Sequence, residues 1–192
     1  MNAEVIISVL GDSLVSGYGL EFTDSFPYKL EIALNTFSKN VIVKNAGVSG
    51  DTSAGGLARL SWVLEEDPDI VVIVLGSNDM LRGIPPLETK KNLTEIVKII
   101  KSKKIGIVFC GMKASLNLGN EYTKDFNKIY PEIAKEFNLI FFPFFLEMVA
   151  LNKSLNQNDL IHPNVKGVEL IVKNIIPSIS LAINEHIAKL NK

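Results

Sequence analysis

Val5-Ile6-Ile7-Ser8-Val9-Leu10 runs directly into Gly11-Asp12-Ser13-Leu14, and this stretch decides the predicted fold. The apolar, β-branched run predicts a buried strand, and Gly11 marks its end. A serine directly after a strand lies at the strand's carboxyl end, where open α/β sheets bind their ligands. Ser13 is therefore the first candidate nucleophile. The same residues leave a structural alternative open, in which Asp12 and Ser13 cap a following helix.

Further strand-like runs alternate with amphipathic stretches of helical character. The predicted strands are 5–10, 41–43, 70–75, 105–109 and 139–142. The predicted helices are 26–37, 54–66, 87–102, 122–137 and 165–190, and Pro177 is expected to kink or break the last of them. Because the strands are apolar throughout, this βαβ alternation predicts a parallel sheet covered on both faces: a doubly wound, three-layer α/β/α domain of about five parallel strands.

Composition narrows the class of protein further. The 192 residues are enough for a sizeable core, and we expect residues 1–192 to form a single domain. The 20 basic and 21 acidic residues leave a net charge of -1, which argues against nucleic acid or another polyanion as partner. The one cysteine, Cys110, follows an apolar run, so we expect a buried structural thiol without a disulfide rather than a catalytic one.

The sequence also predicts where the protein works. No stretch was expected to approach the roughly 20 apolar residues that a membrane span needs, so stable membrane insertion is not expected. No basic region followed by an apolar segment precedes the first strand, so we expect no secretory leader and a cytoplasmic location. A leader removed beforehand would leave the same pattern and would make the location periplasmic or secreted.

Asp159-Leu160-Ile161-His162-Pro163 is the second decisive segment. A carboxylate three residues before a histidine can turn back to the imidazole Nδ1–H, which leaves Nε2 free to act as a base. The other histidine, His186, lies in the polar C-terminal helix, where a surface role is expected. With Ser13 available, Asp159 and His162 complete a predicted Ser-His-Asp triad, in which His162 takes the serine proton and Asp159 orients the imidazole.

Attack on an acyl carbon creates an oxyanion, which needs hydrogen-bond donors. After the second predicted strand, small residues in 45–52 let backbone N–H groups approach a ligand, and Gly50 is the best donor position. After the third, Asn78 in Gly76-Ser77-Asn78-Asp79 can aim its side-chain amide at the same crevice. Each segment taken alone is equally typical of an ordinary turn.

Together and in this order, the four segments resemble the GDSL family of lipases and esterases, also called SGNH hydrolases after their Ser, Gly, Asn and His blocks. The resemblance implies a flavodoxin-like three-layer fold without cofactor or metal. It implies Ser13 as nucleophile, with Asp159 and His162 completing the triad. It also implies an oxyanion hole made by the backbone N–H groups of Ser13 and Gly50 and the side chain of Asn78.

Within the family, the sequence is similar to the thioesterase I, lysophospholipase and arylesterase subgroup in four segments: residues 49–52, 55–60, 78–83 and 143–145. This likeness implies a serine esterase for short- to medium-chain acyl esters, which include aryl esters, lysophospholipids and acyl thioesters. Two departures concern acyl-length preference. Ser77 stands where the subgroup often has glycine, and residues 113–116 lack the usual arginine and prolines.

The longest irregular segments, 76–86, 111–121 and 151–163, follow or approach strand ends, and functional residues concentrate on such loops. Seven of their apolar residues are candidates for an acyl site, although we expect at least half of them to be core anchors instead: Met80, Leu81, Ile84, Pro85, Met112, Leu160 and Ile161.

Three other functions remain possible on sequence grounds. Deacetylation of a carbohydrate needs only a small acyl pocket. A binding module on the same fold would bind a ligand without reaction. A metal hydrolase would use Asp12, Asp51, Asp79 and His162, but one histidine with scattered aspartates makes a poor zinc site. The expected partner is a small acyl ester, and the natural substrate, ester or thioester preference and oligomeric state stay open.

Overall fold

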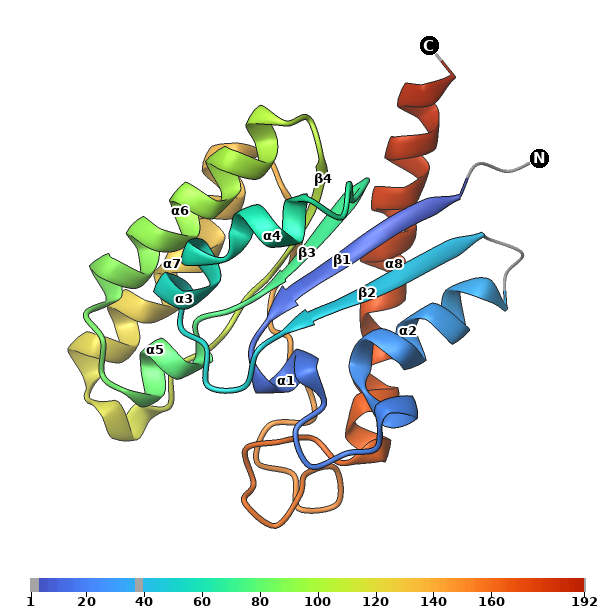
Figure 1. Ribbon diagram of the computed structural model, residues 1–192. Helices are drawn as coiled ribbons and strands as arrows, with labels where there is room; N and C mark the ends of the chain where they lie inside the picture. The colour runs from blue at the N-terminus through green and yellow to red at the C-terminus, as the bar shows by residue number, and fades with distance from the viewer. Residues whose placement is uncertain (1–3, 37–39, 192) are drawn as a thin grey trace.

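Five parallel strands form one sheet in the order β2-β1-β3-β4-β5 (Figure 1). The computed structural model describes residues 4–36 and 40–191. The strands are β1 Val5–Gly11, β2 Val41–Gly47, β3 Ile70–Val74, β4 Gly106–Cys110 and β5 Ile140–Phe142. The order is that of flavodoxin-like folds, in which the chain leaves β1 in one direction and returns past it to β3. The predicted α/β/α class is confirmed.

Helices cover both faces of the sheet. In Figure 1, α2 and α8 lie on one face and α3, α4, α6 and α7 on the other. The helices are α1 Ser13–Ser16, α2 Phe26–Asn35, α3 Ser53–Ala58, α4 Leu60–Leu64, α5 Ser77–Leu81, α6 Pro86–Ser102, α7 Asn120–Phe137 and α8 Val165–Leu190, with 3₁₀ turns at Phe22–Asp24 and Leu116–Leu118. Every residue of β3 is buried between the two layers, as a parallel sheet requires.

The largest differences from the predicted element boundaries concern β2 and the helix predicted at 54–66. Strand β2 continues four residues beyond the predicted 41–43, because Lys44–Gly47 pair in register with β1 although lysine and asparagine are poor strand formers. The predicted helix 54–66 is divided into α3 and α4 at Arg59, whose backbone leaves the helical region. Helix α2 ends at Asn35, and position 37 of its predicted range lies outside the described residues.

Helix α8 runs through Pro177 without a break, so the predicted break is wrong. Proline removes one helical hydrogen bond, but Ile175 and Ile179 on either side are fully buried, and this packing stabilises the helix. By length and composition alone α8 is apolar enough to cross a membrane, which corrects the expectation that no stretch approaches that limit. Its apolar side packs on the sheet and on α2, as in a core helix.

Cys110 ends β4 and is fully buried, as predicted. Burial raises the pKa of the thiol far above its usual value, which keeps the group protonated. Its surroundings therefore suit a structural side chain.

Candidate active site

Strand β1 ends at Gly11, and Ser13 starts the short helix α1 at the carboxyl edge of the sheet. Asp12 caps this helix, since its carboxylate accepts the Leu14 N–H at 3.0 Å. The capping role left open by the sequence is thus correct for Asp12. Ser13 is not used as the cap, and its hydroxyl faces a histidine instead.

Ser13, His162 and Asp159 lie in one hydrogen-bonded line. The Ser13 Oγ is 2.9 Å from His162 Nε2, and His162 Nδ1 is 2.6 Å from Asp159 Oδ2. The other Asp159 oxygen accepts the backbone N–H groups of Ile161 at 2.9 Å and His162 at 3.0 Å, so the loop itself orients the carboxylate. These hydrogen bonds lower the pKa of Asp159 to about 2 and keep the carboxylate ionised, and the bond from the His162 side chain has the largest effect.

The backbone N–H groups of Ser13 and Gly50 donate to no protein acceptor in the described part of the chain. Gly50 has φ +83°, a left-handed conformation that glycine adopts without strain. Its carbonyl accepts a hydrogen bond from Arg82 Nη2 at 2.6 Å, which fixes the plane of the turn. Two free donors are therefore present on the loops that follow β1 and β2.

Asn78 lies in α5, directly after β3, and its side-chain amide is tied to both neighbouring loops. Nδ2 donates to Asp12 Oδ2 at 3.1 Å and to the Asp51 carbonyl at 2.9 Å. The Ser77 hydroxyl also donates to Asp12 Oδ2. Burial raises the pKa of Asp12, and the hydrogen bond from Ser77 opposes this rise most strongly. The Ser, Gly and Asn segments of the sequence thus meet at one place.

A model of the GDSL-like lipase/acylhydrolase family matches residues 9–170. The chain belongs to this family. An arylesterase of Vibrio mimicus is 39% identical over 156 residues, 81% of this chain and 78% of that protein. Thioesterase 1/protease 1/lysophospholipase L1 of Escherichia coli strain K12 is 38% identical over 157 residues, 81% of this chain and 74% of that protein.

Solved structures agree with the family assignment. The crystal structure of AlinE4, an SGNH-hydrolase family esterase, has a TM-score of 0.80 and 42% identity, and the match covers 95% of this chain and 98% of that one. The GDSL protein described here is a serine esterase. The predicted family and reaction are thereby confirmed, and a binding module without activity is not the right interpretation.

Two residues that support the histidine of the GDSL esterase were missed by sequence reasoning. The Tyr18 ring packs on the His162 imidazole, with 4.6 Å between ring centroids. Gln157 donates through its backbone N–H to the His162 carbonyl at 2.8 Å, and through Nε2 to the Tyr18 carbonyl at 2.8 Å. Neither residue belongs to a recognisable motif. The two contacts of Tyr18 join loops that are far apart in the sequence, and the contact between Gln157 and His162 lies within one loop.

Arg59 was also missed, although it holds two of the site's loops. Its Nε donates to Asp51 Oδ2 at 2.6 Å, and its Nη2 donates to the Gly11 carbonyl at 2.9 Å. Asp51 belongs to the Gly50 turn, and Gly11 precedes the nucleophile. The sequence signals were its place in segment 55–60, which is similar to the subgroup, and its position eight residues after Asp51 on a predicted helix.

The carboxylates considered for a metal site each have a different partner in the GDSL esterase. Asp51 pairs with Arg59, and Asp12 accepts from Ser77 and Asn78. Asp79 is fully buried. Its carboxylate accepts hydrogen bonds from the Ser53 N–H and from the hydroxyls of Ser53 and Thr89. Over residues 4–36 and 40–191, no three His, Cys, Asp or Glu residues gather in a way that could hold a metal ion.

The predicted acyl-site residues are distributed unevenly. Met112 is a core residue, Met80 packs against the core, and Ile84 and Leu160 are half-buried, whereas three others are exposed: Leu81, Pro85 and Ile161. Two hollows in the surface of the GDSL esterase, of about 350 and 530 Å³, are lined by residues of the sheet edge and of α3, α4 and α6, and neither is lined by the triad.

Proposed function

We propose that this GDSL esterase hydrolyses its substrates through an acyl-enzyme on Ser13. The observation that carries the proposal is the unbroken line from Ser13 Oγ through His162 to Asp159, with distances of 2.9 and 2.6 Å. His162 Nε2 takes the hydroxyl proton as Oγ attacks the acyl carbon, and then gives it to the leaving alcohol or thiol. Asp159 stays ionised throughout and stabilises the imidazolium.

The N–H groups of Ser13 and Gly50 are the proposed oxyanion donors, together with the amide of Asn78. The backbone groups are unoccupied by protein acceptors among the described residues, so a substrate oxygen meets them without displacing a bond. The Asn78 amide already donates to Asp12 and to the Asp51 carbonyl, which fixes its direction. An oxyanion therefore has to share one of these two amide hydrogens.

For substrates, we propose short- to medium-chain acyl esters, with aryl esters, lysophospholipids and acyl thioesters included. Support comes from the relatives, which are named an arylesterase and a thioesterase and lysophospholipase. Exposed apolar side chains near the triad, Ile161 beside His162 and Leu81 in the Asn78 helix, suit a short alkyl or aryl group. The cytoplasmic location and the absence of membrane insertion stay predictions.

Hydrolysis of p-nitrophenyl esters with acetyl, butyryl, hexanoyl, octanoyl and dodecanoyl chains tests this proposal. We expect kcat/KM to peak below the dodecanoyl ester, and the Ser13→Ala variant to lose turnover on every ester while keeping its melting temperature. Hydrolysis that survives in Ser13→Ala would contradict the assigned nucleophile. Activity confined to acetylated sugars would instead favour carbohydrate deacetylation.

A further inference from the structure

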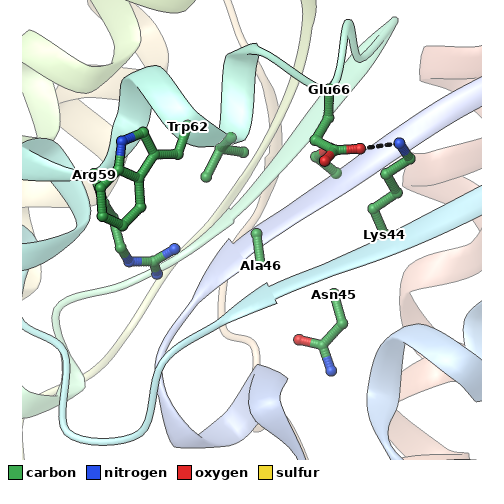
Figure 2. Close-up of a pocket in the computed structure, with 8 residues that line it drawn as sticks. Lys44, Asn45, Ala46, Arg59, Trp62 and Glu66 are labelled. Atoms are coloured by element: carbon green, nitrogen blue, oxygen red, sulfur yellow. Dashed lines mark hydrogen bonds and ion pairs between the residues drawn. The ribbon is translucent and has the colours of Figure 1, made fainter.

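The hollow of about 350 Å³ lies where α4 approaches strands β1 and β2, and the reaction proposed above makes no use of it (Figure 2). Strand β2 is the edge of the sheet, and its Lys44 and Ala46 line the hollow. On the opposite wall are residues of α4 and of the turn that follows, Trp62 and Glu66 among them. The volume is in the range of sites for small organic ligands.

Ser8 forms the polar floor of this hollow. The residue is 1% exposed, and its buried hydroxyl has no hydrogen-bond partner among the described residues. Buried polar groups in folded proteins are almost always hydrogen-bonded, so an unpartnered hydroxyl on a residue that lines a hollow points to a missing partner. An apolar residue would have continued the β1 pattern equally well at this position.

Lys44 places a positive charge next to that hydroxyl. Ser8 and Lys44 are register partners on adjacent parallel strands, which lie about 4.8 Å apart, so both side chains leave the same face of the sheet. The Lys44 ammonium pairs with Glu66, but both side chains are partly exposed, and such a pair contributes little. The ammonium has three hydrogens and can therefore bind a second anion. Arg59 also lines the hollow, but its guanidinium is paired with Asp51, so Lys44 is the cation that a ligand would meet.

The other end of the hollow carries the Trp62 ring together with the Arg59 side chain. Figure 2 shows Trp62 and Arg59 at one side, Lys44 and Glu66 at the other, and Ala46 between them. Trp62 is 71% exposed, although a tryptophan ring offers a large apolar surface that is usually buried. Val63 also lines the hollow. A ligand that fits has one anionic end and a short apolar body.

We propose that this hollow binds a small organic carboxylate, with the carboxylate on the Ser8 hydroxyl and the Lys44 ammonium and the apolar body against Trp62. Both groups donate hydrogen bonds, and the two oxygens of one carboxylate can accept from both. Ester hydrolysis releases carboxylic acids, so the ligand class is one that the esterase meets as a product. The site is nevertheless separate from the triad and does not depend on Ser13.

Trp62 is the only tryptophan, so its fluorescence reports on the hollow directly. We expect hexanoate, added to the full chain, to change this emission with a saturable Kd on the order of 1 mM. Hexanol, which has the same chain without the charge, should bind at least about tenfold more weakly. An absent or unsaturable response to hexanoate, or equal binding of hexanol, would overturn the proposal.

Variants separate this site from the triad. Ser8→Ala and Lys44→Met should each weaken hexanoate about tenfold and leave ester hydrolysis unchanged. Lys90→Met is the matched control, since Lys90 has the same 36% side-chain exposure and a similar pair with Glu132, and it should bind as wild type. Wild-type affinity for hexanoate in Ser8→Ala would show that the Ser8 hydroxyl does not bind the ligand. Loss of the Trp62 response in Ser13→Ala would place the ligand at the triad instead, and either result refutes the site.

Discussion

Asp12 is the side chain that connects the nucleophile to the Asn78 amide. Its carboxylate accepts the N–H of Leu14, directly after Ser13, and the side-chain donors of Ser77 and Asn78. Being fully buried, it needs these donors, because an ionised carboxylate without partners is strongly disfavoured in the interior. The position of the Asn78 amide is therefore set by a residue that the sequence offered as a helix cap or as a metal ligand.

We predict that Asn78→Ala lowers kcat by about 10² to 10³, the usual effect of removing one oxyanion donor. KM should change little, because the missing hydrogen bond is strongest to the charged oxygen of the transition state. Steady-state kinetics on p-nitrophenyl butyrate, with circular dichroism to confirm folding, checks this. A kcat within about threefold of wild type would remove Asn78 from the oxyanion hole.

Replacing Asp159 by asparagine should lower kcat by roughly 10³ to 10⁴, because the amide no longer selects the productive imidazole tautomer. Asp159→Asn keeps the size of the side chain, so loss of packing is a minor factor. Wild-type kinetics in this variant would contradict the role of Asp159.

Asp159 also predicts a dependence of stability on pH. Its pKa is about 2 in the fold, below the ordinary 3.8, so the ionised form is favoured by folding. This contribution is complete above pH 3.8 and is lost as the pH falls towards 2. Because the side chain is 37% exposed, we expect Asp159→Asn to cost under about 1 kcal/mol at pH 7. Denaturant unfolding of wild type and Asp159→Asn should show that the difference in their free energies of unfolding shrinks in acid. A difference that grows in acid would contradict this contribution of Asp159.

At the scale of the elements, α5 and the Gly50 turn are joined by one side chain. Arg82 follows α5 directly and donates to the Gly50 carbonyl, so the helix that carries Asn78 also holds the peptide between Gly50 and Asp51 in place. Two of the proposed oxyanion donors are thus positioned relative to each other. The contact is exposed, which limits its contribution.

We therefore expect Arg82→Leu to lower kcat about threefold to tenfold with little change in KM, as for one charge-assisted hydrogen bond at the surface. Arg82→Lys should recover part of the loss, because it restores a positive donor. Lys90→Leu, a change of the same kind on α6, serves as the control. Equal kcat values for wild type and Arg82→Leu would show that the Gly50 turn holds its shape unaided.

The sequence predicted the elements best where one pattern dominates. Apolar runs located all five strands, and the run is clearest in β3, which is buried throughout between the two helical layers. It failed where tertiary contacts overrule local preference, as in the extension of β2, the division at Arg59 and the unbroken helix at Pro177. Such outcomes depend on the neighbours that a segment meets after folding, which a local pattern does not contain.

The residues of the site likewise divide into those that a local motif predicts and those that only the structure reveals. Ser13, Asp159 and His162 stand in recognisable motifs, and the structure brings them together. Tyr18 and Arg59 act through contacts between distant loops, and the local sequence does not indicate these contacts. Motifs therefore located the reacting groups, and the structure was needed for the residues that hold them.

At the scale of the molecule, the strand order assembles the site. The chain turns back across β1 on its way to β3, so the loops after these strands meet at one edge of the sheet. The loop before α8 then carries His162 to Ser13, 149 positions away in sequence. The triad thus combines the loop after β1 with the segment between β5 and α8.

From this shared core we predict that residues 1–192 unfold as one domain. Loss of far-UV circular dichroism and loss of esterase activity should follow the same transition in urea, with coincident midpoints. Two separate transitions in the dichroism would mean that the chain contains two units. An earlier loss of activity alone would place the site on loops that open before the core.

The most direct test of the central claim is intact mass after treatment with a small p-nitrophenyl phosphonate. Attack by Ser13 Oγ forms the oxygen–phosphorus bond, nitrophenolate leaves, and His162 takes the serine proton. We expect a single adduct, located by digestion on the peptide that contains Ser13, loss of esterase activity in step with it, and no adduct on Ser13→Ala. An adduct on another residue, or one that persists in Ser13→Ala, would contradict it.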